Sequence, residues 1–578
     1  MMTEKQERWA TFALIALAAA IFVGSAGIPA LLDDADSFYA EVARTMNLRH
    51  DWITPYVNSL RYLEKPPLFF WLISLSYSVF GFASAFTARL PTALAVVALT
   101  FVTVKIGKLL FGFRAGLFSG VALATSIGMF LFTRIILPDA VFTLMLSLIF
   151  YSFLRWEKEE RKASWMMWMY VFTALAVMAK GLIGVAFPAG ILFFTLALSS
   201  RWHDIWRLIS FKGIVVFLAI AAPWHILIGM RNPGFFWFYF VNEHLLRFLG
   251  KRYPMDYGTV PLIPFWLLHI VWLFPWSIYL LTLLRPKNFK QALTENGRQL
   301  LLPLCWALTI LLFFSFSTRL EYYTVPAFPA LALLAGLQCS RLWEGKGKWP
   351  SLTLGVIGAL VGVSLLGIAI FVSSKTPDAW LKLKDNPDLY AYYLGHLFDL
   401  TPESLLALRT PLVLAGIAFG LFLPLHHFLN KSETKAATLA IGMGVFFVAA
   451  NLGFLIFAPR LTSKPIAEEI NRRMGKDALI IIDGEYEEGC SVAFYTQRTV
   501  MLHNGQSSNL EYGSRYPDAP RLFPDDGGLK SLWLQNNFRV YLVTFQHKAE
   551  KLPAEIQSSK HELARYGDKI LLSNRADK

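Results

Sequence analysis

The chain has 578 residues, of which 55% are hydrophobic and 16% are charged, and its formal net charge is +14. This composition excludes an ordinary soluble domain and predicts a polytopic α-helical membrane protein. Basic loops that orient membrane helices account for the positive charge, so we expect no nucleic-acid partner.

About thirteen segments reach or approach the ~20 apolar residues that are needed to span a bilayer. The first runs from about Trp9 to Leu31 and lacks a small-residue cleavage site, which predicts a retained helix rather than a signal peptide. The other predicted spans are centred near residues 97, 121, 146, 173, 192, 218, 272, 307, 329, 362, 419 and 447.

Lysine and arginine gather in alternate loops, which are the loops expected to stay in the cytoplasm. The N-terminus is therefore predicted to be cytoplasmic, and an odd number of spans places everything after about Arg460 on the outer side. The basic groups are Lys105/Lys108/Arg114, Arg155/Lys158/Arg161/Lys162, Arg201/Arg207/Lys212, Arg285/Lys287/Lys290/Arg298, Arg341/Lys346/Lys348 and Lys431/Lys435.

Two outer loops, 32–84 and 230–260, are long and rich in aromatic and charged residues. Phe38, Val42 and Met46 recur at helical spacing in the first loop, which predicts a helix lying in the membrane interface. The second loop contains "FFWFYFVNEHLLRFLGKRYP" and is also expected to lie flat, with its rings among the headgroups. A third outer loop, 374–408, is predicted to form a lid.

The composition changes near the end of the last span. We predict a transmembrane domain over 1–458 and a small soluble α/β domain, on the outer side, over 459–578. Its predicted strands are "ALIIIDG", "SVAFYTQ" and "RVYLVTF", and its predicted helices are "PIAEEINRRM" and a segment around 549–566.

Charges at the outer ends of the spans are the candidates for chemistry, because charge is costly there without a role or a partner. In "RYLEKPPLFFWL", the two prolines hold the chain extended and can present Lys65 to a lipid phosphate, although a snorkelling lysine fits as well. Asp139 either complements a helix N-terminus or meets Asp36 across the bundle, as a carboxylate pair that could orient a hydroxyl, accept a proton or hold a cation.

Several other outer residues have two interpretations. Glu243 and Arg247 have the spacing of an ordinary helical ion pair. Tyr323 fits an aromatic belt, whereas Arg319 at the same end is less easily explained that way. Glu64 and His244 are candidate ligands for a divalent metal ion, although no second histidine stands at metal-site spacing. The three cysteines also have no metal-site spacing, and no internal disulfide is expected.

Five segments carry a resemblance to a known family. The chain resembles the protein mannosyltransferase-like glycosyltransferases of the membrane-embedded GT-C class, most closely the bacterial transferases of 4-amino-4-deoxy-L-arabinose to lipid A. The matching segments, in order over about residues 9–340, are "YAEVARTMNLRHDWITPYVNSLRYLEKPPLFFW", "LPDAVF", "MAKGLIGVAFP", "FVNEHLLRF" and "LLFFSFSTRLEYYTVPAFPALALL".

The resemblance implies a GT-C-type fold and transfer of a sugar from undecaprenyl phosphate to lipid A at the periplasmic face of the bacterial inner membrane, by a protein expected to be a monomer. It implies catalytic roles for Asp36 and Asp139. Lys65 is implied as the cation for the lipid phosphate, and Arg319 is added because fixed cations stabilise a departing phosphate. The implied neighbours in this pocket are Tyr39, Tyr62, Glu64, Arg247 and Tyr323.

One departure from the family pattern concerns the first outer loop. The family often reads Asp-Glu-x-Arg-Tyr where this chain has Ala35-Asp36-Ser37-Phe38-Tyr39, so Asp33, Asp34 and Asp36 all stay candidates for the central acid. Two other functions stay open: a related polyprenyl-phosphate sugar transferase acting on protein or another glycan, and a secondary transporter. The transporter is disfavoured because no inverted repeat and no mid-span charge is evident.

Overall fold

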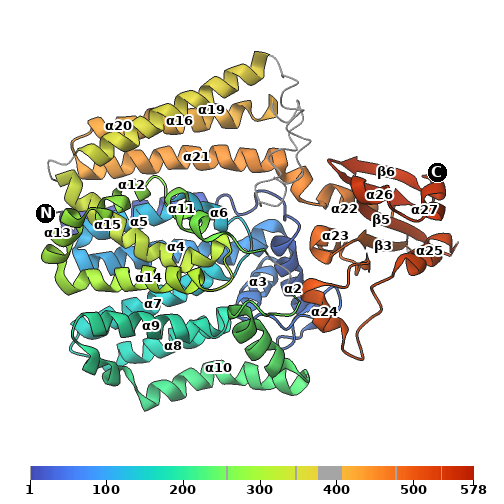
Figure 1. The fold of residues 1–578 in the computed structure, drawn as a ribbon, viewed down its shortest axis with the longest axis horizontal. Helices are drawn as coiled ribbons and strands as arrows, with labels where there is room; N and C mark the ends of the chain where they lie inside the picture. Colours follow the sequence, from blue (N-terminus) through green and yellow to red (C-terminus); the bar gives the residue numbers. More distant parts are fainter. Residues whose placement is uncertain are drawn as a thin grey trace.

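The computed structural model describes residues 2–254, 258–344, 348–374, 406–475, 478–535 and 537–577. Figure 1 shows a broad bundle of helices, and a smaller domain with a sheet that lies against one end of the bundle and carries the C-terminus. The lid predicted for 374–408 falls largely outside the described residues.

The bundle is made of long apolar helices. Among the described residues, eight helices are long and apolar enough to cross a membrane, or up to nine if one pair bent by 114° is a single span. The other predicted spans also fall on helices, which are shorter or carry charges at one end. The multi-pass α-helical class is confirmed. The helices are α1 (Glu4–Phe22), α4 (Ala85–Phe111), α5 (Phe113–Ala124), α6 (Ile127–Phe132), α7 (Asp139–Lys158), α8 (Ala163–Lys180), α9 (Ile183–Leu198), α10 (Phe211–Arg231), α11 (Leu262–Trp272), α12 (Ser277–Leu280), α13 (Pro286–Asn296), α14 (Leu301–Ser315), α15 (Phe328–Glu344), α16 (Trp349–Ser374), α19 (Arg409–Ile417), α20 (Leu423–Phe428) and α21 (Ser432–Leu461).

Short 3-10 and π-helical turns connect or interrupt these helices. They are η1 (Trp202–Leu208), η2 (Trp237–Leu246), η3 (Leu281–Leu284), η4 (Gly297–Leu300), η5 (Glu321–Ala327) and η9 (Ala418–Phe422).

The first helix begins and ends earlier than the sequence suggested. Thr3 and Gln6 form a capping box that satisfies free backbone N–H groups at its start. The helix ends at Phe22, where the predicted span continued to Leu31. Gly24 and Pro29 lie in the segment that follows, and both residue types disfavour a continuing helix.

Small residues allow the central helices to pack closely. A Cβ atom added at Gly107 of α4 would lie 2.5 Å from the Cα atom of Gly116 in α5. One added at Gly336 of α15 would lie 2.4 Å from the backbone nitrogen of Ser119 in α5. Close backbone approach of this kind stabilises helix pairs in lipid, where burial of apolar surface gives little net driving force.

Residues 32–84, the first of the predicted outer loops, form a folded layer between the bundle and the smaller domain (Figure 1). It consists of α2 (Ala35–Arg49), a short hairpin of β1 (Tyr56–Val57) and β2 (Leu60–Arg61), and α3 (Leu68–Phe80). The predicted helix is therefore present as α2. Its Phe38, Val42 and Met46 side chains are buried, and α2 packs against α3 and against α23 of the smaller domain.

The smaller domain is built on a five-stranded sheet in the order β4-β3-β5-β7-β6. β3 runs parallel to β4 and β5, while β7 is antiparallel to both β5 and β6. The elements are α22 (Lys464–Arg473), β3 (Ala478–Asp483), η10 (Tyr486–Glu488), α23 (Cys490–Thr496), β4 (Met501–His503), α24 (Ser508–Ser514), α25 (Asp526–Leu534), β5 (Arg539–Phe545), α26 (Gln546–Ala549), α27 (Ala554–Ser559), β6 (His561–Tyr566) and β7 (Lys569–Ser573).

Two predicted elements of this domain were wrong. "SVAFYTQ" is the helix α23 and not a strand, because a short apolar run has no period that separates the two. The helix expected over 549–566 is the short α27 followed by β6. The predicted strands β3 and β5 and the predicted helix α22 are present.

Candidate active site

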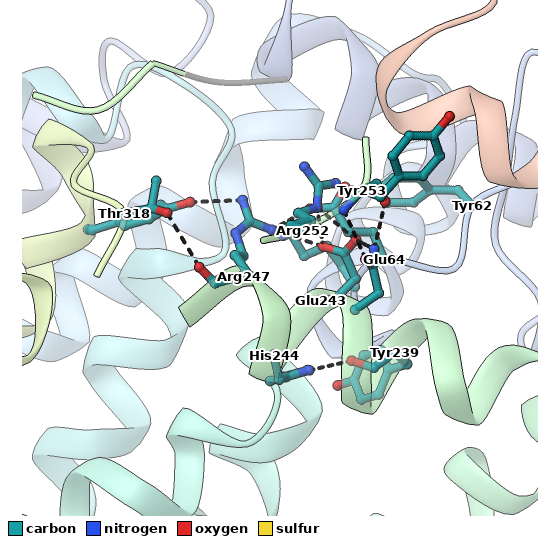
Figure 2. A network of polar contacts seen from close by, with 12 residues as sticks. Tyr62, Glu64, Tyr239, Glu243, His244, Arg247, Arg252, Tyr253 and Thr318 are labelled. Carbon is teal, nitrogen blue, oxygen red and sulfur yellow. Dashed lines mark hydrogen bonds and ion pairs between the residues drawn. The ribbon is translucent and has the colours of Figure 1, made fainter. Parts of the chain in front are cut away.

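The core of the candidate site lies around Glu64, which follows the β1–β2 hairpin. Its carboxylate forms an ion pair with Lys65 and accepts a hydrogen bond from Arg247 Nη1 at 3.0 Å. Arg252 Nη2 lies 3.5 Å from the same carboxylate, and the Tyr62 hydroxyl donates to it at 3.3 Å. Figure 2 shows Tyr62, Arg247 and Arg252 around Glu64.

The second part of the site comes from η2 and the residues that follow it. Glu243 accepts from Arg247 Nη1 at 3.1 Å and from Arg252 Nε at 2.8 Å. Arg247 Nη2 also donates to the Tyr323 hydroxyl, 2.9 Å away in η5. Glu64 and Arg247, which are 183 residues apart in the sequence, are thus joined by a single guanidinium (Figure 2).

Burial and charge act in opposite directions on these groups. Burial alone would raise the pKa of Glu64, but the three surrounding cations hold that pKa well below its usual range. Burial, with Glu64 nearby, raises the pKa of Glu243. Burial lowers the pKa of Lys65, although Glu64 opposes this effect. A second anion beside Lys65 would therefore favour its charged form.

Asp139 and Lys180 extend the network toward the membrane helices. Asp139, at the start of α7, forms an ion pair with Lys180, at the end of α8. The Lys180 ammonium lies 5.3 Å from the centre of the Tyr323 ring, so the pair adjoins the tyrosine that contacts Arg247. Asp139 is buried, and its Oδ2 atom has no hydrogen-bond partner among the described residues. Such an atom is costly unless a ligand or water satisfies it.

Asp36 is placed differently from the predicted carboxylate pair. It forms a buried ion pair with Arg89 of α4, and both side chains are 1% exposed. Its oxygens also accept from the backbone N–H groups of Ile136, at 3.0 Å, and Leu32, at 2.9 Å. Asp139 is paired with Lys180, so the expected direct contact between Asp36 and Asp139 is not formed. Separate cations compensate the two charges.

Tyr39 lies close to the Glu64 cluster. Its ring centre is 6.4 Å from that of Tyr62, and it also packs on Phe70 of α3. Burial raises the pKa of its hydroxyl well above the usual value, and the charge of Glu64 adds to this effect. Tyr39 therefore stays protonated and can donate a hydrogen bond.

Arg319 is held by backbone oxygens. Its guanidinium donates to Val260 O at 2.7 Å and Ser315 O at 3.0 Å. Among the residues that the structure describes, no carboxylate pairs with it. Its neighbour Thr318 contacts the backbone oxygen of Arg247 at 3.5 Å (Figure 2), so Arg319 borders the cluster without joining it.

Glu64 and His244 do not fit a shared metal site. His244 Nδ1 donates to Tyr239 O at 2.6 Å, and Nε2 accepts from the backbone N–H of Leu182 at 3.2 Å. Figure 2 shows the ring pointing toward Tyr239 and away from Glu64. Burial lowers the pKa of His244 to about 4, so the ring is neutral near pH 7. In the described parts of the chain, no group of three or more His, Cys, Asp or Glu residues is arranged to hold a metal ion.

Three residues of this arrangement were absent from the predicted site. Lys180, Arg252 and Arg89 complete the ion pairs of Asp139, Glu243 and Asp36. Lys180 did carry a signal, because it is a lone cation on a short outer loop within "MAKGLIG". Nothing in the sequence identifies Arg89 as the partner of a residue 53 positions away.

Comparison with known proteins identifies the type of enzyme. The model of the dolichyl-phosphate-mannose-protein mannosyltransferase family matches residues 64–227. The solved structure of ArnT from Cupriavidus metallidurans bound to undecaprenyl phosphate superposes with a TM-score of 0.81 at 24% identity, over 98% of each chain. This chain has the fold of a GT-C-type glycosyltransferase. The sequence resemblance is thereby confirmed.

Curated relatives match most of the chain. The undecaprenyl phosphate-alpha-4-amino-4-deoxy-L-arabinose arabinosyl transferase of Pectobacterium atrosepticum is 29% identical over 535 residues, which are 89% of this chain and 88% of the relative. The transferase of the same name from Pectobacterium carotovorum is 25% identical over 534 residues, with the same two shares. The match therefore extends beyond the membrane helices into the smaller domain.

Proposed function

We propose that the protein transfers 4-amino-4-deoxy-L-arabinose from undecaprenyl phosphate to a phosphate of lipid A. The observation that carries this proposal is the joined cluster of Lys65, Arg247, Arg252, Glu64 and Tyr323. In this cluster the cations Lys65, Arg247 and Arg252 surround the carboxylates of Glu64 and Glu243, so positive charge is concentrated where a phosphate could bind. The names of the curated relatives and the undecaprenyl phosphate of the structural neighbour support the identity of the donor.

The reaction needs a site that accepts negative charge. The bond between the anomeric carbon and the donor phosphate oxygen breaks, and its electron pair leaves with undecaprenyl phosphate. An oxygen of the acceptor phosphate forms the new bond. Fixed donors placed where this charge develops lower the barrier. Lys65 and Arg247 supply the positive charge. The Tyr323 hydroxyl lies beside Arg247 and can donate a hydrogen bond to the same phosphate.

The Asp139–Lys180 pair is proposed to contact the sugar and the acceptor. The unpartnered Oδ2 atom of Asp139 can accept a hydrogen bond from the amino group or a hydroxyl of the sugar. A lipid A phosphate is already ionised near neutral pH, so the acceptor needs orientation more than a strong base. Asp36 serves the same site by holding the start of α2, because its oxygens are already occupied.

The sugar should be inverted at its anomeric carbon. Lys65 and Arg247 hold the leaving phosphate on one face of the sugar, so the acceptor must approach from the opposite face. Retention in the product would contradict this geometry.

The proposed orientation places the site in the periplasm. The cluster and the smaller domain lie at the same end of the bundle, while the basic loop that contains α13 lies at the other end (Figure 1). We therefore propose a bacterial inner-membrane protein with a cytoplasmic N-terminus and a periplasmic C-terminal domain over 459–578. All proposed site residues come from one chain, so a monomer suffices.

The test is a transfer assay with purified protein. Undecaprenyl phosphate-linked 4-amino-4-deoxy-L-arabinose is supplied with lipid A, and products are identified by mass spectrometry, with the anomer determined by NMR. A protein acceptor in a parallel reaction tests the alternative that the mannosyltransferase family match raises. Modified lipid A is expected. Transfer to protein alone would overturn the proposed acceptor.

A further inference from the structure

The strongest feature outside the cluster is the attachment of residues 31–34 to the C-terminal domain. This segment lies immediately before Asp36 and α2. Leu31 N donates to the Tyr495 hydroxyl at 2.9 Å, and Leu31 O accepts from Thr462 Oγ1 at 2.6 Å. Asp34 N donates to Glu487 O at 2.9 Å. These backbone contacts tie the segment to the C-terminal domain at several points.

Asp33 supplies the central contact of this attachment. Its carboxylate forms an ion pair with Lys569 at the start of β7, and both side chains are less than 10% exposed. It also accepts from the backbone N–H of Ser491, at 2.9 Å, and from Ser463 Oγ, at 2.7 Å. The Lys569 ammonium donates to Ser463 Oγ at 3.1 Å. A buried charge with this many partners fixes the segment in one arrangement.

The membrane domain holds the same segment from the other side. Asp36 pairs with Arg89 of α4 and accepts from Ile136 N before α7. Its Oδ2 atom also accepts from Leu32 N, so the anchors of Asp33 and Asp36 share one short turn. The start of α2 is thus fixed between the C-terminal domain and the bundle.

A displacement of α2 would also move side chains that lie next to Glu64. Tyr39 lies one helical turn after Asp36 and is close to Tyr62, which bonds Glu64. On the opposite side, Phe38 packs against Tyr486 of the C-terminal domain, with ring centres 5.8 Å apart. A small displacement of reacting groups is sufficient to slow an enzyme strongly.

We propose that the C-terminal domain is a positioning part of the active site, which acts through the Asp33–Lys569 pair to set the place of α2 and its Asp36 and Tyr39 side chains. Asp33 and Lys569 are positioning residues, because neither is placed against substrate. The inference rests on the proposed transferase function. It also assigns different tasks to two of the acids in the first outer loop: Asp33 holds the C-terminal domain, and Asp36 holds the bundle.

The test compares Lys569→Met, Lys569→Arg and a matched control, Lys530→Met. Lys530 also forms an ion pair within the C-terminal domain, with Glu555, but both side chains are more than 40% exposed. We expect Lys569→Met to lower kcat on the order of 10- to 100-fold, with little change in KM for the polyprenyl donor. Lys569→Arg should restore most of kcat, and Lys530→Met should match the wild type.

Hydrogen exchange provides a readout that does not depend on activity. In Lys569→Met, amides of residues 35–49 should exchange faster than in the wild type, while amides of α4 should be unchanged. Normal kcat and normal exchange in Lys569→Met would overturn the inference. If the wild type transfers no sugar, the proposed function fails, and faster exchange in α2 would still show the coupling between the domains.

A purely structural role would give a different result. It would lower the yield of folded Lys569→Met and leave the kcat of the folded fraction unchanged, and this outcome would also overturn the inference. Asp33→Asn provides a second variant, because it keeps the size of the side chain and removes only its charge. It should reproduce the loss of kcat.

Discussion

Lys65 is the residue on which the proposed chemistry depends most directly. Its partly buried ammonium pairs with Glu64, within a cluster in which the other charges each have more than one partner. Removal of one member of such a cluster leaves the others close together, so the fold is retained while the charge offered to a phosphate changes. Activity is therefore expected to be more sensitive than folding at this position.

We expect Lys65→Ala to lower kcat by about 10²- to 10³-fold, as for the loss of one donor to a developing anion. The kcat of Lys65→Arg should lie between those of Lys65→Ala and the wild type, because arginine keeps the positive charge but has a planar guanidinium in place of the ammonium. The measurement is steady-state transfer to lipid A. Lys212→Ala, at an exposed lysine of a basic loop, is the control. Equal turnover by all four proteins would remove Lys65 from the site.

Asp139 and Lys180 allow stability and activity to be separated. Asp139→Asn leaves Lys180, whose side chain is only 13% exposed, without its counter-charge, which should cost about 3 kcal/mol of stability. The double variant Asp139→Asn/Lys180→Met removes both charges and should recover most of that loss, while transfer stays low. Thermal unfolding and turnover of the two variants test this expectation. Recovery of activity in the double variant would mean that Asp139 acts only as a structural partner.

Only part of the site could be predicted from the sequence. The family motifs pointed to Lys65, Arg247 and Tyr323, and the structure brings them together. The motifs could not distinguish Asp33 from Asp36, because the two lie three positions apart and their partners, Lys569 and Arg89, are distant in the sequence. Ion pairing over such separations is decided by the fold and leaves no local pattern.

Among the elements, α4 and α5 can pack closely only if small residues occupy their contact, and this requirement can be tested. A methyl group at Gly107 would lie 2.5 Å from the Cα atom of Gly116, so the two backbones would have to separate. We expect Gly107→Ala to cost about 1–3 kcal/mol, as overpacked sites do. Thermal unfolding in detergent measures this cost.

The matched control for that variant is Gly453→Ala in α21, where an added Cβ meets nothing within 4 Å. Alanine also has the higher helix propensity, so this control should be neutral or slightly stabilising in the same assay. An equal loss of stability in both variants would show that close packing of α4 on α5 is not the cause.

The C-terminal sheet carries a prediction about pH. His503, at the end of β4, contacts Asp483 at 2.7 Å through Nδ1 and Asp526 at 2.8 Å through Nε2. Burial alone would lower the pKa of His503, but the two carboxylates raise it above 6.5. Lys548 also faces this group, because its ammonium donates to the backbone oxygen of Asp483 at 3.2 Å. A raised pKa in the folded state stabilises the fold below about pH 6.5, and this contribution is lost as the pH rises through the raised value.

We therefore expect the difference in melting temperature between wild type and His503→Gln to shrink from pH 6 to pH 9. Differential scanning fluorimetry at several pH values measures this difference. Comparison with the variant cancels the contributions of other titrating groups. A difference that grows with pH would mean that the neutral imidazole makes the stronger contacts.

Sequence reasoning identified elements most reliably where a pattern was long. Each predicted membrane span falls on a helix, and β3 and β5 were predicted from apolar runs. The short strands β4, β6 and β7 were missed. β6 has only partly buried or exposed residues, so its sequence shows no buried run. Such strands form because a neighbouring strand provides partners for hydrogen bonding, β3 for β4, β5 for β7 and β7 for β6, and this information lies outside the segment.

In the molecule as a whole, the proposed site lies at the boundary between the lipid bilayer and water. The helices provide a framework in lipid, and the C-terminal domain lies at the end of the bundle where the charged cluster gathers (Figure 1). A polyprenyl donor can stay in the bilayer while its phosphate reaches the cations at that end. The acceptor phosphate then has to be on the same side of the membrane as the C-terminal domain.

This arrangement requires the C-terminal domain to lie on the periplasmic side of the membrane. Labelling of single introduced cysteines can test this orientation. The three native cysteines are buried, which keeps background labelling low. Ser558→Cys introduces an exposed thiol in the C-terminal domain, and Lys290→Cys introduces one in α13 at the opposite end. In intact cells with a permeabilised outer membrane, an impermeant maleimide should label the first variant and should label the second only after lysis. The reverse result would place the phosphate-binding cluster in the cytoplasm, where a periplasmic lipid A acceptor is out of reach.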